Sequence, residues 1–227
     1  MSIPGTFSSM IGQRESLPIL YIGNAGKNVG STDVGTTDTF NASTAVGDLL
    51  LCFNEVDDAR SVSTPSGWTQ FYNQAFAPYS RGTHYYKIHD TGSTVFLQQS
   101  GGQIVSSVLT FRNTGTNFTM STGQYDANNN GTLVTPSIVT PVDNCFVLFG
   151  FTHDAPRDDN NVATSWTNAN ISSASELLDI TTSANFDGGI CIWGGYKTSA
   201  GNTGTTTVSV HTSVQGCSTF AICLLPV

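Results

Sequence analysis

The sequence predicts an all-β protein, a two-sheet sandwich of the jelly-roll or concanavalin-like type with an extended N-terminal arm. Short apolar runs of period two recur along the chain, separated by Gly, Asn, Asp or Pro. The helix formers Glu, Lys, Gln and Arg are scarce, and only 11% of the 227 residues are charged. In addition, the order of the runs in the first half of the chain repeats in the second.

The predicted strands follow one another at short intervals. Two of them, 48–54 and 144–152, contain unbroken apolar stretches, which are typical of central strands covered on both faces. Others alternate, as where Val95 and Leu97 fall on one face and Phe96 on the other. In chain order, the predicted strands are 19–22, 48–54, 67–73, 83–89, 94–99, 103–112, 119–125, 144–152, 176–180, 189–197, 205–212 and 216–225.

The internal repeat sets the predicted domain organisation. The segment at 47–53, Gly-Asp-Leu-Leu-Leu-Cys-Phe, corresponds to the segment at 143–149, Asp-Asn-Cys-Phe-Val-Leu-Phe. Trp68 corresponds to Trp166 in the same way. Lys87 and Lys197, two of the three lysines, each follow a tyrosine. We therefore predict an arm with a first strand or loop at 1–37, and one sandwich at 38–227. Its interleaved half-repeats span about 47–113 and 143–225.

Composition and charge exclude several function classes. The net charge is −8, so a basic face for nucleic acid or for an anionic membrane is not expected. The longest apolar runs have five or six residues, too short for a transmembrane helix, and the first residues lack the pattern of a signal peptide. Five cysteines lie in or beside apolar runs, which favours reduced core thiols. These features predict a protein made in a cytosol.

Several blocks resemble structural proteins of tailed bacteriophages. They are Gly-Asp-Leu-Leu at 47–50, Thr-Pro-Ser-Gly-Trp-Thr at 64–69, Tyr-Tyr-Lys at 85–87 and Thr-Phe-Arg-Asn at 110–113. The stretch 135–140 is similar to the connection between the two halves in that family. The resemblance covers about 47–227. It implies a virion component with a jelly-roll or concanavalin-like sandwich, of a group that includes capsid decoration proteins, tail proteins and fibre tips.

From this resemblance we expect a non-enzymatic virion protein that decorates the capsid and is assembled in the host cytoplasm. Its expected partners are other virion proteins, capsid or tail, contacted through the N-terminal arm. A homo-oligomer, specifically a symmetric trimer, fits this role. The alternative is a receptor-binding or carbohydrate-binding module of a tail fibre or tail tip, with a host glycan as ligand. A third hypothesis, an enzyme that degrades host polysaccharide, needs a pair of carboxylates in a groove.

Candidate contact residues lie in the densest aromatic region. Phe76 and Tyr79 fall on a predicted loop at 76–79, where exposed rings could stack on a sugar or fill a partner's pocket. Tyr72, on the strand before this loop, is a third candidate. By contrast, the matching positions of Trp68 and Trp166 in the two halves favour a packing role for both.

Two other segments match known functional motifs only in part. Asp126, Asn128 and Asn130, followed by Gly131, copy the start of a calcium loop, but Ser137 stands where the closing Glu should be. A polar linker is the alternative, so no metal is predicted. Glu55 and Asp57 resemble part of the Glu-x-Asp-x-Glu motif of laminarinase-type glycosidases, but Ala59 replaces the second Glu. No catalytic residue and no cofactor is therefore expected.

Overall fold

The computed structural model describes residues 16–30, 36–57, 60, 62–76, 80–97, 103–125, 131–154, 162–182, 188–211 and 214–227. These residues form eighteen strands and no helix, and every strand pair is antiparallel. The predicted all-β class is confirmed. All five cysteines are buried and none forms a disulfide, which agrees with the predicted core thiols.

The first eight strands build one large sheet and a small pair. They are β1 (Leu20–Asn24), β2 (Asn28–Gly30), β3 (Thr36–Thr39), β4 (Leu49–Asp57), β5 (Thr69–Phe76), β6 (Ser80–Ile88), β7 (Thr94–Leu97) and β8 (Ile104–Arg112). The large sheet has the order β1-β8-β4-β6-β5, and β2 also pairs with β8. We call it the first sheet. Strands β3 and β7 pair separately.

The remaining ten strands build a second large sheet and two small ones. They are β9 (Thr114–Tyr125), β10 (Thr132–Thr135), β11 (Val139–Thr140), β12 (Cys145–Asp154), β13 (Ala163–Thr167), β14 (Ser172–Thr182), β15 (Gly188–Lys197), β16 (Gly201–Asn202), β17 (Thr206–Val210) and β18 (Gln215–Pro226). The second sheet has the order β14-β15-β12-β18-β9. The small sheets are β10-β17-β13 and β11-β16.

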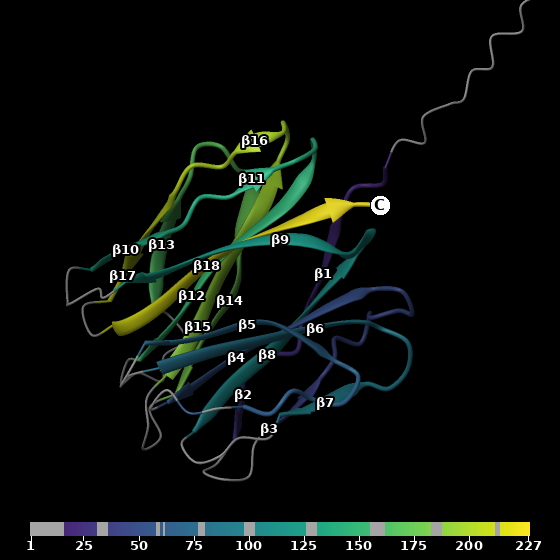
Figure 1. Cartoon of the computed structure of the whole chain (residues 1–227), viewed down its shortest axis with the longest axis vertical. Coiled ribbons are helices and arrows are strands. Elements are labelled where there is room, and N and C mark those ends of the chain that lie inside the picture. The colour runs from purple at the N-terminus through teal and green to yellow at the C-terminus, as the bar shows by residue number, and fades with distance from the viewer. Residues whose placement is uncertain are drawn as a thin grey trace, which may run out of the picture.

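The two large sheets pack face to face, as the two central layers in Figure 1 show. Leu49, Leu51 and Phe53 project from β4 into the space between the sheets, because alternate residues of a strand share a face. Phe146 and Leu148 of β12 enter the same core from the other side. Phe53 also stacks on Phe220 of β18, with ring centroids 5.6 Å apart. This shared core holds the two sheets together.

The outer face of each large sheet is covered as well. Leu50 and Cys52 of β4 point away from the shared core and pack with Phe40 and with the β3–β7 pair. On the second sheet, Val147 and Phe149 point outward into a separate apolar cluster. Because both faces of β4 and β12 are covered, these strands are apolar without alternation, as the sequence predicted.

The halves are not interleaved as predicted. Each large sheet takes all its described strands from one half of the chain, and no described strand before 113 pairs with one after it. The chain passes from the first sheet to the second at Asn113, between β8 and β9, after all the strands of the first sheet are complete, so each ladder forms within one half. The halves meet through side-chain packing instead of backbone hydrogen bonds.

Part of the predicted arm belongs to the sandwich. Residues 1–15 lie outside the described residues, but β1 and β2 pair with β8, and β3 crosses the predicted boundary at 37. Ile19 is buried in the shared core. Asn24 and Tyr21 of β1 donate side-chain hydrogen bonds to the Leu177 carbonyl of β14, at 2.8 and 3.2 Å. Strand β1 therefore ties the first sheet to the second.

Candidate functional site

The predicted contact residues do not form one exposed cluster. Tyr72 is buried in the shared core, where its ring stacks on His84 at 4.6 Å and lies 5.8 Å from Phe220. Its ring is therefore not available to an external partner, and the prediction that Tyr72 is a contact residue is wrong. Phe76 is the last residue of β5 and is half-buried. Tyr79 lies outside the described residues.

A β-bulge explains the position of Tyr72. The pairing of β5 with β6 shifts register between Gln70 and Tyr72. An extra residue in one strand reverses the faces of the residues that follow it. As a result Tyr72 points into the shared core, and Phe71 beside it also packs against that core.

The weaker motifs give no site in the described part of the chain. Asp126, Asn128 and Asn130 lie outside it, so the calcium hypothesis is not addressed by the fold. Among the described residues, no group of three or more His, Cys, Asp or Glu side chains is placed to hold a metal ion. Glu55 is almost fully buried between the sheets, where a Cβ on Gly188 of β15 would collide with its carboxylate.

The motif blocks at 47–50 and 110–113 meet in an ion pair. Arg112 donates from Nε and Nη2 to the two carboxylate oxygens of Asp48, both at 2.8 Å. Burial alone would raise the pKa of Asp48. The hydrogen bonds from Arg112 and from the Ala45 amide outweigh burial and lower that pKa below its usual value. The pair joins the start of β4 to the end of β8, so these blocks have a structural role.

The Thr-Pro-Ser-Gly-Trp block forms a tight turn before β5. The Trp68 amide donates to the Pro65 carbonyl at 3.1 Å, and Gly67 has a φ of +78°, a region that favours glycine. The turn directs the Trp68 ring toward Phe40, with centroids 6.1 Å apart in an edge-to-face arrangement. Trp68 is only 8% exposed, which agrees with the predicted packing role.

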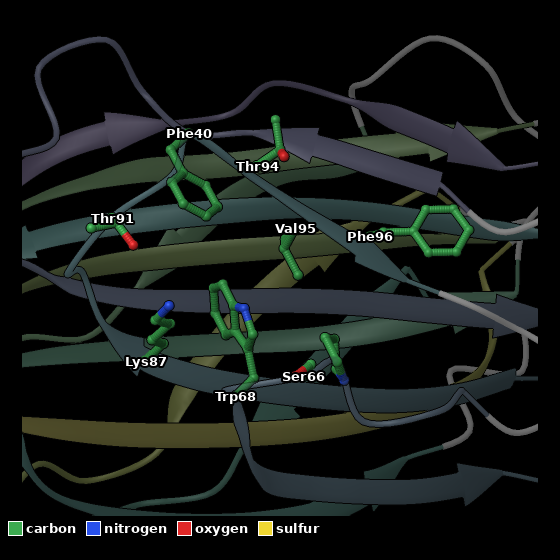
Figure 2. Close-up of a pocket in the computed structure, with 9 residues that line it drawn as sticks. Phe40, Ser66, Trp68, Lys87, Thr91, Thr94, Val95 and Phe96 are labelled. Atoms are coloured by element: carbon green, nitrogen blue, oxygen red, sulfur yellow. The ribbon is translucent and has the colours of Figure 1, made fainter.

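Beside Trp68 the outer face of the first sheet is hollowed. The hollow has a volume of about 340 Å³, at the lower end of the range for small-molecule sites. Figure 2 shows Phe40 and Val95 pointing down toward Trp68, with the Lys87 ammonium group at one side. We call it the Trp68 hollow. Its lining residues are Phe40, Pro65, Ser66, Trp68, Lys87, Thr91, Thr94, Val95 and Phe96.

The polar and apolar parts of the Trp68 hollow are distinct. Lys87 makes an ion pair with Asp90 at 2.7 Å, at the end of β6. The Lys87 hydrogen bond and the Thr91 amide lower the pKa of Asp90, so this carboxylate is ionised at neutral pH. On β7, Phe96 is 51% exposed, whereas Val95 beside it in sequence is buried. The hollow thus offers the Lys87 ammonium group, hydroxyls and aromatic rings.

A second hollow of about 270 Å³ adjoins the first across Phe40, which lines both. His89 lines it and packs edge-to-face on Phe40 at 5.8 Å. His89 is buried, and its Nδ1 has no hydrogen-bond partner among the described residues. We call this the His89 hollow. Its lining residues are Thr39, Phe40, Asn41, Ala42, Thr44, His89, Gly92 and Ser93.

Sequence reasoning missed these hollows. Phe40 and His89 carry no motif of their own, and they meet Lys87 of the Tyr-Tyr-Lys block only when the β3–β7 pair covers the first sheet. Phe96 did carry a signal. It occupies the face of β7 opposite Val95 and Leu97, which is where alternation predicts solvent. A large aromatic residue on the face of a strand that is expected to be exposed to solvent indicates a contact surface.

Buried ionisable groups lie elsewhere in the fold. Asp38 of β3 is fully buried on the outer face of the first sheet, and burial raises its pKa to about 6, although the Ser106 and Asn28 side chains act to lower it. His84 and His153 are also fully buried. Burial lowers the pKa of each to about 3, so both imidazoles are neutral at pH 7. These groups make stability depend on pH, but they do not line either hollow.

Comparisons of the chain with protein-family models, with curated proteins and with solved structures returned no match. In the described part of the chain, no helix has the length and hydrophobicity needed to cross a membrane.

Proposed function

We propose that this chain is a non-enzymatic structural protein of a tailed-phage virion that decorates the capsid surface. The observation that carries this proposal is the meeting of the resemblance blocks in the Asp48–Arg112 pair and the Trp68 turn. These blocks stabilise strand ends and bring no reacting groups together. A repeated motif that stabilises strand ends fits a structural protein that functions in binding and assembly.

We also propose that the two halves are repeats, each of the jelly-roll type. Matching β1 to β9, β8 to β18, β4 to β12, β6 to β15 and β5 to β14 makes the orders of the two large sheets identical. The same matching relates the β3–β7 pair to the β10–β17 pair. The repeats on this view extend over 20–112 and 114–226, beyond the 47–113 and 143–225 expected from sequence.

The non-enzymatic part of the proposal is supported by the environment of the carboxylates. A glycosidase needs two carboxyl groups about 5–9.5 Å apart in a groove. Among the described residues, neither hollow is lined by Asp or Glu, and Asp90 is paired with Lys87. Glu55, the residue most like a catalytic carboxylate in sequence, is buried between the sheets.

The N-terminal arm is the proposed docking element for other virion proteins. Residues 1–15 precede the edge strand of the first sheet, where Leu17 is 63% exposed and Leu20 is 42% exposed. An extended segment that leaves a sheet edge can add to a neighbouring sheet or lie across a neighbour's surface. We propose assembly as a trimer in the host cytoplasm, which light scattering would detect as three times the 24.0 kDa chain mass.

Immunogold labelling of intact particles of the source virus tests the virion role. We expect label spread over the head lattice, and loss of that label for a chain lacking residues 1–15. A chain lacking these residues should keep the β-sheet circular dichroism of the full chain, because the described fold begins at residue 16. Particles without any label would overturn the proposal.

A second candidate function is a receptor-binding or carbohydrate-binding module of a tail fibre or tail tip, with a host glycan as ligand. The observation that favours it is the Trp68 hollow, which has the exposed Phe96 at one end, Lys87 at the other, and Trp68 between them. Label confined to tails or fibre tips in the same images would select this function over capsid decoration.

A further inference from the structure

The two hollows on the first sheet adjoin each other at Phe40, and we call them together the groove. Phe40 lines both of them. The segment between β6 and β7 also serves both, because Thr91 and Thr94 line the Trp68 hollow while Gly92 and Ser93 line the His89 hollow. A ligand with two linked rings could therefore occupy both hollows, one on each side of Phe40. Together they provide about 610 Å³, the sum of 340 and 270 Å³.

The apolar part of the groove is aromatic. The side chains of Phe96, Trp68 and Phe40 all line the Trp68 hollow, and Phe96 is half exposed. An aromatic ring covers the C–H face of a sugar ring well, because that face is flat and apolar while the hydroxyls project from its rim. In Figure 2 the Phe96 ring stands at the end of the hollow, turned to the outside.

The polar part of the groove suits hydroxyl groups. Each sugar hydroxyl is both a donor and an acceptor. Lys87 offers donors from the lining of the Trp68 hollow, where the Thr91 and Thr94 side chains add hydroxyls. In the His89 hollow, Thr44 and Ser93 add hydroxyls from the lining.

The charges favour a neutral ligand over an acidic one. The positive charge of Lys87 is already balanced by Asp90. The whole chain carries −8, which repels anions at low ionic strength. Neither hollow has a second Lys or Arg in its lining that would hold a carboxylate.

We propose that the groove formed by the Trp68 and His89 hollows binds a neutral glycan of at least two hexose rings. One ring lies in the Trp68 hollow, between Phe96 at one end and Lys87 at the other, and the next ring lies in the His89 hollow on the far side of Phe40. This proposal rests on the second candidate function and names its ligand class. It does not require that the chain sits on the capsid.

Saturation-transfer NMR on the full chain tests the proposal. The probes are glucose, galactose, mannose, lactose and maltose, with glucuronic acid as the acidic counterpart. We expect transfer to at least one neutral disaccharide, with a stronger signal than its component hexoses give, and little transfer to glucuronic acid. No transfer to any neutral probe, or stronger transfer to glucuronic acid, would overturn the proposal.

Matched variants locate the binding. Phe96→Ala and Lys87→Met should each raise the dissociation constant of the bound disaccharide at least tenfold. Lys197→Met is the control, because Lys197 also follows a tyrosine at the end of a strand but lies on the second sheet. Its dissociation constant should stay within twofold of the unmodified chain. An equal loss in Lys197→Met, or none in Phe96→Ala, would contradict the site. The NMR uses no virus particles, so its failure leaves the labelling test of the virion role unaffected.

Discussion

The outer faces of the two large sheets are covered differently. On the first sheet the cover is the two-stranded β3–β7 pair, and Trp68 borders an open hollow. On the second sheet the cover includes the three-stranded β10-β17-β13 sheet. There Trp166 stacks on Trp193, with centroids 6.1 Å apart and ring planes 2° from parallel. In the first half the buried Trp68 borders a hollow, whereas in the second half the half-buried Trp166 stacks on a second tryptophan.

Under the proposed repeat, this difference would separate a packing role in the second half from a binding role in the first. Trp193 also contacts Phe149, and Trp166 contacts Phe151, so the stack continues the core of the second half. Among the described residues, the Trp68 ring contacts the ring of Phe40, and both rings line the Trp68 hollow. A ring stacked within a cluster contributes packing energy, whereas a ring that lines a hollow can contact a ligand.

The largest expected effect separates the two tryptophan environments. Trp193→Ala should lower the free energy of unfolding by about 3–5 kcal/mol, the usual cost of removing a buried large aromatic side chain. Trp68→Ala should cost less, because the hollow beside Trp68 means that fewer contacts are lost. Urea denaturation of both variants measures the two changes. An equal or larger loss for Trp68→Ala would break the comparison.

Acid should destabilise the protein through its buried histidines. The pKa of His84 and of His153 is about 3 when folded, against about 6.5 when unfolded. Their contribution to stability is complete above pH 6.5 and is lost as the pH falls toward 3. At pH 4.5 the loss is about 2–3 kcal/mol for each histidine, at about 1.4 kcal/mol per pH unit. Urea denaturation at pH 7 and pH 4.5 measures this loss.

Variants assign that loss to a residue. His153→Gln should reduce the difference in stability between pH 7 and pH 4.5. The buried imidazole of His153 has to remain neutral for the protein to stay folded, whereas a glutamine side chain does not titrate in this range. His211→Gln is the control, since His211 is half-buried, not enclosed. The same difference in His153→Gln and in the unmodified chain would contradict the assignment.

The outer face of the first sheet should respond to pH in the opposite direction. The pKa of Asp38 is about 6 when folded and about 4 when unfolded, so its contribution to stability is present below pH 4 and is lost as the pH rises through 6. Asp38→Asn should therefore stabilise the protein by about 1–3 kcal/mol at pH 7. That gain should shrink toward zero by pH 4. A destabilised variant at pH 7 would show that the carboxylate is needed there.

The smallest expected effect on stability is at the groove itself. Lys87→Met removes an ion pair with an exposed partner, and such pairs contribute little. The melting temperature should stay within about 2 °C of the unmodified value. A larger fall, measured by differential scanning calorimetry, would mean that Lys87 serves the fold and not a ligand.

The sequence predicted the strands better than their arrangement. Unbroken apolar runs identified the central strands, because residues such as Leu49 to Phe53 need cover on both faces. The arrangement could not be read from periodicity, since period two gives the faces of a strand but not which sheet lies opposite. The interleaved halves were wrong for this reason. At Tyr72 the bulge in β5 changed which face of the strand the side chain occupies, and no local residue pattern indicated this bulge.

The candidate site was predicted poorly for a related reason. Its residues come from the end of β3, the turn before β5, the end of β6 and β7, which are brought together only by the layered packing. Phe96 and the Trp68 block were visible in the sequence. Lys87 was visible as a repeated lysine, but its pairing with Asp90 and its place beside Phe40 depend on the fold.

The most direct test of the difference between the outer faces uses the three tryptophan side chains. In a ¹⁵N-labelled chain, each indole N–H of Trp68, Trp166 and Trp193 gives its own NMR signal. During titration with lactose and with maltose, we predict that the Trp68 signal shifts for at least one sugar while the signals of Trp166 and Trp193 stay in place. Shifts at Trp166 or Trp193 equal to those at Trp68, or no shift at Trp68 with either sugar, would contradict the assignment of binding to the first sheet.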